Sequence, residues 1–234
     1  MGATSHPELD AAARFTEQYY TEKAKLFGAT PFGVDWTCIA TQQMRFVQLL
    51  RICDFGQPFV INDLGCGYGA LLDFIRIKYP ATQIRYQGVD LSAELIRLGV
   101  LHPPTAAGCF TVGGRNTVEA DYTVASGIFN VRSSQSITIW ERMIEATLDQ
   151  IASTSRKGFA INFLQGLRSS NGDEHLRTAL YRAVPERWAE YCRVRLESDV
   201  ELISDYGLAE FTLLVRPPGL RHERASWARS SNGR

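Results

Sequence analysis

The middle of this 234-residue chain alternates short apolar runs with stretches whose apolar residues recur at helical spacing. Strands that alternate with helices are typical of a parallel sheet covered by helices on both faces. We therefore predict an α/β fold with a doubly wound, mostly parallel, seven-stranded sheet. The expected strands of the alternating part are Phe59–Leu64, Ile84–Asp90, Cys109–Val112, Tyr122–Ser126 and Gly158–Leu164.

The segment before the first strand is predicted to be helical. Residues 9–28 and 37–53 both carry apolar residues at helical spacing, and Asp35 or Thr37 is the expected N-cap of the second helix. Because this segment is not needed to complete the sheet, we interpret residues 1–56 as an N-terminal helical lid or cap.

The other end of the chain breaks the strand–helix alternation. Val200–Ile203 and Glu210–Val215 are joined by a turn at Gly207 without a helix, which predicts a C-terminal antiparallel β-hairpin. Residues 57–216 would then form the main domain. Residues 217–234, rich in Arg and Ser and without periodicity, are expected to be a flexible tail.

The charge balance excludes several classes of partner. Lys and Arg total 25 and Asp and Glu total 25, so the chain lacks the basic footprint of a general nucleic-acid binder or a polybasic membrane anchor. The N-terminus has no apolar signal segment, and no run approaches the ~18 apolar residues of a membrane span. We expect a cytoplasmic monomer or homodimer without nucleic-acid or membrane partners.

Cysteine and histidine positions argue against a metal or disulfide framework. The five cysteines are widely and irregularly spaced without a CxxC pair, and the four histidines never fall at metal-ligand spacing. We therefore expect free thiols and no bound metal.

The sharpest motif is FVINDLGCGYGALLDFI, residues 59–75. A strand containing Asp63 leads into a turn with Gly65, Gly67 and Gly69, and a helix follows at once. Such glycines let a ligand approach the backbone, while the helix N-terminus offers free N–H groups. Asp90 ends the next strand 21 residues beyond Gly69, about the spacing of a ribose-binding carboxylate. The motif predicts a nucleoside site.

These residues alone leave more than one function open. Gly65, Gly67 and Ala70 also satisfy the dinucleotide fingerprint, so an NAD(P)-dependent oxidoreductase is an alternative. Against it, Asp63 would face a pyrophosphate with like charge, whereas it could accept from an ammonium. The terminal hairpin also stands where a second mononucleotide-binding half would be. A non-catalytic partner subunit that keeps the fold is a further alternative.

DLGCGYG followed by GVDLS resembles the first two motifs of the class I S-adenosylmethionine-dependent methyltransferases. ADYTVASGIFNV and EFTLLVRP resemble their fourth and last strands, and GVDW and the MRF helix resemble a bacterial small-molecule subgroup. The resemblance, over about residues 15–216, implies a Rossmann-like fold, S-adenosylmethionine as cofactor and S-adenosylhomocysteine as product. It also implies methyl transfer by in-line displacement to an O, N or C atom of a small molecule, with natural-product biosynthesis as a setting.

The resemblance also implies roles for individual residues. Asp63 would hold the methionine ammonium through water, and Asp90 would bind both ribose hydroxyls. The other implied contacts are to the methionine and ribose (Gly65, Cys66, Gly67), the adenine face (Leu91) and the methionyl group (Ala125, Ser126, Gly127). The sequence departs from the family at 112–116, where VGGRN replaces the usual acidic residue near adenine. After the fourth strand SGIFN stands in place of the Asn/Asp-Pro-Pro-aromatic motif of amino-methylating nucleic-acid enzymes.

Candidates outside the motifs keep two interpretations each. Arg45 could reach the cofactor carboxylate with its fork or be a solvated helix arginine. Trp36 could bind substrate beside the sulfonium, and Asn130 could orient the acceptor or cap its loop. His175 and Tyr20 are candidates for a catalytic group, with an exposed histidine and a packed tyrosine as their alternatives. The sequence does not assign the catalytic residue.

Overall fold

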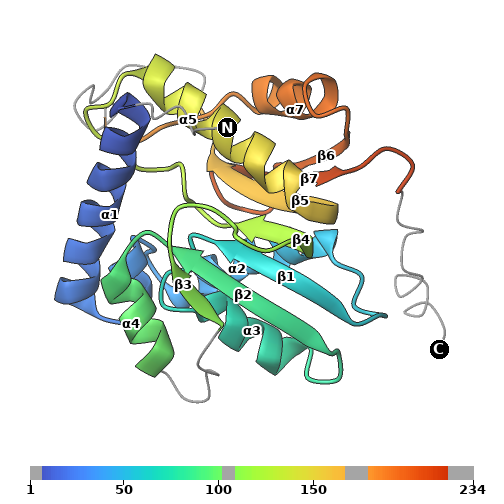
Figure 1. Ribbon diagram of the computed structural model, residues 1–234, viewed down its shortest axis with the longest axis horizontal. Coiled ribbons are helices and arrows are strands. Elements are labelled where there is room, and N and C mark those ends of the chain that lie inside the picture. The colour runs from blue at the N-terminus through green and yellow to red at the C-terminus, as the bar shows by residue number, and fades with distance from the viewer. Residues whose placement is uncertain (1–6, 102–108, 167–178, 221–234) are drawn as a thin grey trace.

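A single seven-stranded sheet with the order β3-β2-β1-β4-β5-β7-β6 forms the centre of the computed structural model, which describes residues 7–101, 109–166 and 179–220 (Figure 1). Strands β1 to β5 pair in parallel, whereas β7 is antiparallel to both of its neighbours. The predicted sheet and C-terminal hairpin are therefore confirmed. The strands are β1 (Phe59–Leu64), β2 (Ile84–Asp90), β3 (Phe110–Val112), β4 (Ala120–Ala125), β5 (Ser155–Leu164), β6 (Asp199–Ile203) and β7 (Glu210–Arg216).

Helices cover both faces of this sheet. On one face α5 and α7 bury Trp140, Ile144 and Trp188 against β5 and β7. On the other face α2 and α3 bury Phe46 and Phe74 against β1 and β4. The helical elements are α1 (Pro7–Phe27), η1 (Pro31–Val34), α2 (Ile39–Leu49), η2 (Leu50–Ile52), α3 (Ala70–Lys78), α4 (Ala93–Leu101), α5 (Ile137–Ser153) and α7 (Pro185–Val194).

Helix α1 lies apart from both layers. It packs against α4 and against α5, and Figure 1 shows it running from one to the other along the side of the sheet. Its contact with α4 includes a hydrogen bond of 2.7 Å between the hydroxyls of Thr21 and Ser92, and Ser92 directly follows Leu91 after β2. Helix α1 therefore bridges the two helical layers beside the carboxyl ends of the strands.

Local details differ from the sequence predictions. The N-cap of α2 is Cys38, without a side-chain cap bond, and not Asp35 or Thr37. Asp35 is drawn away because it adopts a left-handed backbone conformation (φ 62°) and binds the Tyr19 hydroxyl and the Lys23 ammonium at 2.7 Å. Helix α7 was not predicted, because the sequence of this helix is strongly polar and few of its residues are buried: Trp188, Ala189 and Cys192.

Most of the predicted flexible tail, residues 221–234, lies outside the described residues. The part that is described ends in a turn in which the Leu220 N–H donates to the Pro217 carbonyl at 3.3 Å.

Truncating the inner face of α5 should test the packing of this layer. Leu148 is fully buried, so Leu148→Ala should cost about 2–5 kcal/mol of unfolding free energy and lower the melting temperature. Ile137 on the same helix is 57% exposed, so Ile137→Ala should change the unfolding free energy by no more than about 0.5 kcal/mol. Equal effects of the two changes in urea unfolding would contradict the assigned inner face.

Candidate functional site

A cavity of about 570 Å³ opens at the carboxyl ends of β1, β2 and β4. The loops that follow these strands form its floor, and α1, α5 and the β3–β4 connection form its walls. The floor residues are Asp63, Leu64, Gly65, Cys66, Gly67, Asp90, Leu91, Ser126, Gly127, Ile128 and Phe129. Most of the predicted cofactor residues are thus brought together in one place.

The glycine turn requires glycine for the backbone itself. Gly65, Gly67 and Gly69 all have left-handed φ angles, of 74°, 56° and 87°. A Cβ on Gly65 would lie 2.3 Å from the side chain of Ile128, and one on Gly67 would lie 2.9 Å from the side chain of Val34. The alternating glycines therefore reflect three backbone positions at which a side chain would be strained.

Asp90 connects this turn to the second strand. Its Oδ2 accepts from the Gly67 N–H at 2.9 Å and its Oδ1 accepts from the Ser92 N–H at 2.8 Å. Burial raises the pKa of this carboxyl, while the two N–H bonds oppose that rise. Each oxygen has a second lone pair, so the carboxylate can still accept from a vicinal diol such as that of a ribose.

Asp63 is buried near Asp90 and has no cationic partner among the described residues. The Tyr86 hydroxyl donates to its Oδ2 at 2.6 Å. Burial raises the pKa of Asp63 to about 7; the Tyr86 bond opposes this rise and the nearby Asp90 charge adds to it. A ligand ammonium at this wall of the cavity would stabilise the ionised carboxylate.

Of the remaining predicted cofactor residues at the ends of β2 and β4, some line the cavity and one does not. Leu91 lines the cavity and its Cδ2 lies 3.0 Å from the position of a Cβ on Gly114, so it packs on the β3–β4 connection. Ser126 also lines it, and its hydroxyl oxygen is buried without a partner, which leaves a polar atom for a ligand. Ala125 is fully buried in the core at the end of β4.

Cys66 is a buried cavity residue whose thiol is not reactive. Burial raises the pKa of Cys66 well above its usual value, and the charges of Asp90 and Asp63 raise it further. The thiol therefore stays protonated and contributes small size rather than a nucleophile.

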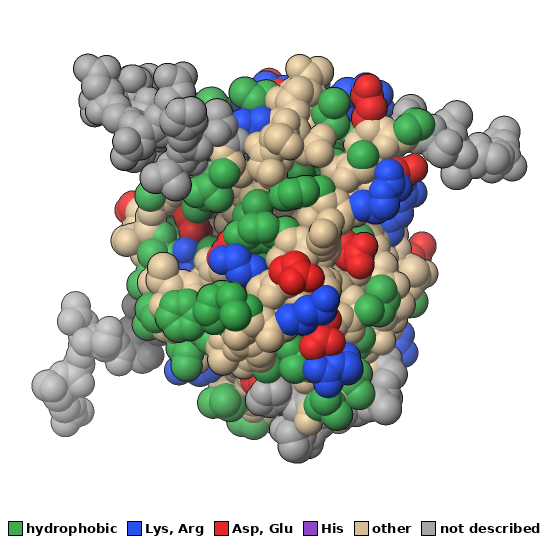
Figure 2. Space-filling view, turned by 90° about the vertical axis from the view of Figure 1, so that its left-hand side faces the viewer, with side chains coloured by type: hydrophobic (Ala, Val, Ile, Leu, Met, Phe, Trp, Pro, Cys, Tyr) green, Lys and Arg blue, Asp and Glu red, His purple; other side chains and the backbone are tan. Residues whose placement is uncertain are grey.

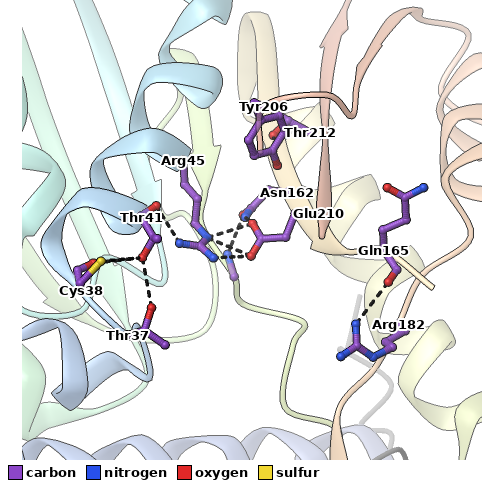
Figure 3. Close-up of polar contacts among 11 residues, drawn as sticks. Thr37, Cys38, Thr41, Arg45, Asn162, Gln165, Arg182, Tyr206, Glu210 and Thr212 are labelled. Atoms are coloured by element: carbon purple, nitrogen blue, oxygen red, sulfur yellow. Dashed lines mark hydrogen bonds and ion pairs between the residues drawn. The ribbon is translucent and has the colours of Figure 1, made fainter. Parts of the chain in front are cut away.

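Arg45 is not solvated, which corrects one of its two predicted interpretations. It is buried, and its Nε donates to both carboxylate oxygens of Glu210, at 3.0 and 2.8 Å (Figure 3). Its Nη1 donates to the Thr41 carbonyl at 2.7 Å. Arg45 is not among the cavity-lining residues, so the fork is held by the protein itself.

The aromatic candidates Trp36 and Tyr20 both line the cavity. The indole of Trp36 packs closely on the backbone of Gly127, because a Cβ there would lie 2.5 Å from a ring carbon. Burial raises the pKa of Tyr20 far above its usual value, and the Asp35, Tyr19 and Asp90 charges add to the rise. The Tyr20 phenol is therefore protonated at neutral pH and unsuited to act as a base.

Of the other two candidates, Asn130 is not among the residues that line the cavity. Asn130 is buried beside the cavity floor, where its N–H donates to the Gly127 carbonyl and its carbonyl accepts from the Tyr181 N–H. Its side-chain oxygen has no partner. His175 lies outside the described residues.

Sequence reasoning expected an N-terminal helical lid but did not identify the residues that form the cavity walls. One is a stripe on α1 (Leu9, Asp10, Ala13, Thr16, Glu17) and another is a face of α5 (Met143, Ala146, Thr147, Gln150). Helical spacing predicts that each set shares a face, but which face covers the cavity depends on tertiary packing. The β3–β4 connection, at Gly113, Gly114, Arg115 and Thr117, lines the cavity where adenine was expected.

Within the described ranges no group of three or more His, Cys, Asp or Glu side chains could hold a metal ion. The same residues contain no helix long and apolar enough to cross a membrane.

Known proteins resemble this chain in sequence and in fold. No family model matches the chain. It is 44% identical over 168 residues to the Mycobacterium tuberculosis protein named "Putative methyltransferase Rv1506c", covering 71% of this chain and 98% of that one.

Solved structures share the fold at low identity. A Burkholderia thailandensis 1,6-didemethyltoxoflavin-N1-methyltransferase, with bound 1,6-didemethyltoxoflavin and S-adenosylhomocysteine, aligns with a TM-score of 0.57 and 16% identity over 93% of this chain and 92% of its own. The plantazolicin methyltransferase BpumL, in complex with a pentazolic desmethylPZN analog and S-adenosylhomocysteine, aligns with a TM-score of 0.59 and 13% identity over 90% and 98%.

The pKa of Asp63 predicts a pH-dependent stability. The folded-state pKa of about 7 exceeds the ~3.9 of an unfolded carboxyl, so the contribution of Asp63 to stability is complete below about pH 4 and is lost as pH rises through 7. Asp63→Asn keeps an acceptor for Tyr86 but has no titrating group. Its free energy of unfolding should therefore rise relative to that of the wild type between pH 4 and 7, and stay about 2–4 kcal/mol higher above pH 7.

Melting temperatures between pH 4.5 and 8.5 measure this effect. Asp205→Asn, at an exposed loop position, is the matched control and should leave the pH profile unchanged. A constant difference between Asp63→Asn and wild type across this range would show that Asp63 is ionised throughout.

Proposed function

Because the chain belongs to the class I S-adenosylmethionine-dependent methyltransferases, we propose that it transfers a methyl group by in-line displacement to an O, N or C atom of a small-molecule acceptor. The observation that carries this proposal is the convergence of Asp63, Asp90 and the glycine turn on one cavity of about 570 Å³. That volume falls within the range of small-molecule sites. The cavity has walls from α1 and α5 that the cofactor motifs do not account for.

The residues of the cavity floor fit the cofactor. When bound, S-adenosylmethionine supplies a methyl group already activated on a sulfonium. Asp90 would accept from the ribose diol, the ionised Asp63 would neutralise the ammonium, and the unpartnered Ser126 hydroxyl would offer a further hydrogen bond. The turn at Gly67 lets the ligand approach the backbone.

The walls favour an uncharged or cationic acceptor. Asp10 and Glu17 of α1 are among the residues that line the cavity, and Arg115 is the only lysine or arginine among its described lining residues. On the face drawn in Figure 2 acidic and basic side chains alternate, so the described part of this face offers no track for a polyanion. Small-molecule substrates of the kind named for the two aligned structures suit such a cavity, which supports a role in natural-product biosynthesis.

Catalysis then depends mainly on placement. Aligning the acceptor atom with the methyl carbon and sulfur, with water excluded, contributes the largest part of the rate enhancement for an activated donor. Tyr20 and Cys66 both keep their protons at neutral pH, so neither acts as the base. An acceptor that arrives unprotonated needs none.

The first experiment measures S-adenosylhomocysteine affinity by calorimetry. Asp90→Asn removes the charge and replaces one acceptor with a donor that faces backbone N–H groups, so affinity should fall at least tenfold. Asp73→Asn, in the first turn of α3 and away from the cavity, is the control and should bind like wild type. Unchanged affinity of Asp90→Asn would refute the assigned ribose site, and binding of NADH in place of S-adenosylhomocysteine would favour the oxidoreductase alternative.

The second experiment concerns the covering segment, residues 7–36. Asp35 ties η1 to α1 through Tyr19 and Lys23, and Thr21 ties α1 to Ser92 beside the ribose site. We propose that this segment is a lid whose closure responds to the cofactor, so amide-exchange protection over 7–36 should rise when S-adenosylhomocysteine binds. The α5–α7 layer is the internal reference. Equal protection of 7–36 with and without ligand would mean that it is a fixed wall.

A further inference from the structure

A buried chain of hydrogen bonds connects α2 to the end of β4. Arg45 donates to Glu210, the Asn162 amide donates to the Glu210 Oε2 at 2.9 Å, and the Asn162 Oδ1 accepts from the Gly127 N–H at 2.8 Å. Arg45, Glu210 and Asn162 are 7%, 2% and 0% exposed. The chain therefore crosses the interior from α2 through β7 to β5, as Figure 3 shows for Arg45, Glu210 and Asn162. It ends on the backbone N–H of Gly127, a residue of the cavity floor.

Trp36 closes this chain on its other side. The Arg45 guanidinium carbon lies 3.8 Å from the centroid of the Trp36 ring, and the benzene edge of the same indole packs on the Gly127 backbone. Trp36 and Gly127 both line the cavity, whereas Arg45, Glu210 and Asn162 do not. The Arg45 guanidinium thus contacts the cavity-lining Trp36 directly. It reaches the cavity-lining Gly127 through Glu210 and Asn162.

The chemistry of the pair suggests more than stability. Buried ion pairs are often replaceable by apolar residues of similar volume without loss of stability, so such a pair is weak evidence for a purely stabilising role. A planar guanidinium can stack on an indole and hold a carboxylate with its fork at the same time, which an ammonium cannot. Arg45 uses both properties.

We propose that Arg45 is a positioning residue for the methionyl end of the cavity. It holds the Trp36 indole against Gly127 and, through Glu210 and Asn162, fixes the Gly127 N–H, and it does not itself bind the cofactor carboxylate. The inference rests on the proposed function, because it requires that the cofactor occupy this cavity.

The test compares melting temperature with S-adenosylhomocysteine affinity. Arg45→Lys and Glu210→Gln should each weaken binding at least tenfold. The double variant Arg45→Met/Glu210→Gln removes both charges and keeps a side-chain oxygen for the Asn162 amide, so it should melt closer to wild type than either single variant but still bind at least tenfold more weakly. If affinity returned together with the melting temperature in the double variant, the pair would be structural only. Tighter binding by Glu210→Gln would show that the freed fork binds the cofactor directly.

A double-mutant cycle tests the route through Trp36. If Arg45 acts through the indole, Arg45→Lys should weaken binding much less in a Trp36→Ala background than in wild type. Additive losses would overturn that route. Arg187, whose guanidinium lies 5.3 Å from the Trp188 ring and pairs with Glu141, is the matched control, since neither residue lines the cavity. Arg187→Met should keep wild-type affinity, and failure of wild-type protein to bind S-adenosylhomocysteine would refute the proposed function instead.

Discussion

The hydrogen bonds that the Asp90 carboxylate accepts from Gly67 and Ser92 hold the site together. They join the turn after β1 to the turn after β2, which are neighbours only because these strands pair in parallel. The left-handed turn is thereby kept in one conformation, with its backbone facing the cavity. A buried carboxylate bound by N–H groups alone is also the acceptor that a ribose diol requires.

The buried carboxylates Glu210 and Asp63 differ in whether they have a cationic partner. Glu210 is paired with Arg45 and serves the protein, whereas Asp63 has no cationic partner in the described part of the chain and carries a pKa raised to about 7. The difference agrees with the proposal that the counterion of Asp63 comes with the ligand. Burial of the ionised Asp63 without a cationic partner lowers the stability of the free protein. An ammonium bound beside it would relieve this cost and so add to the binding free energy.

Sequence alone could predict the sheet, the hairpin and the residues that meet at the cavity floor, because each depends on local patterns: strand runs, the glycine turn and Asp90 at its expected spacing. It could not predict the partner of Arg45, which lies 165 positions away in β7. The only local signal was a glutamate, Glu210, at the start of an apolar strand. The cavity-lining residues of α1 and α5 could not be identified for the same reason, since periodicity defines a helical face but not what that face covers.

A crystal structure of the full chain with S-adenosylhomocysteine would test the central claim most directly. The account predicts the ribose diol on Asp90, the ammonium at Asp63, and the Arg45–Glu210 pair unbroken behind Trp36. A nucleoside bound away from Asp90, or an Arg45 fork moved from Glu210 onto the ligand carboxylate, would contradict it.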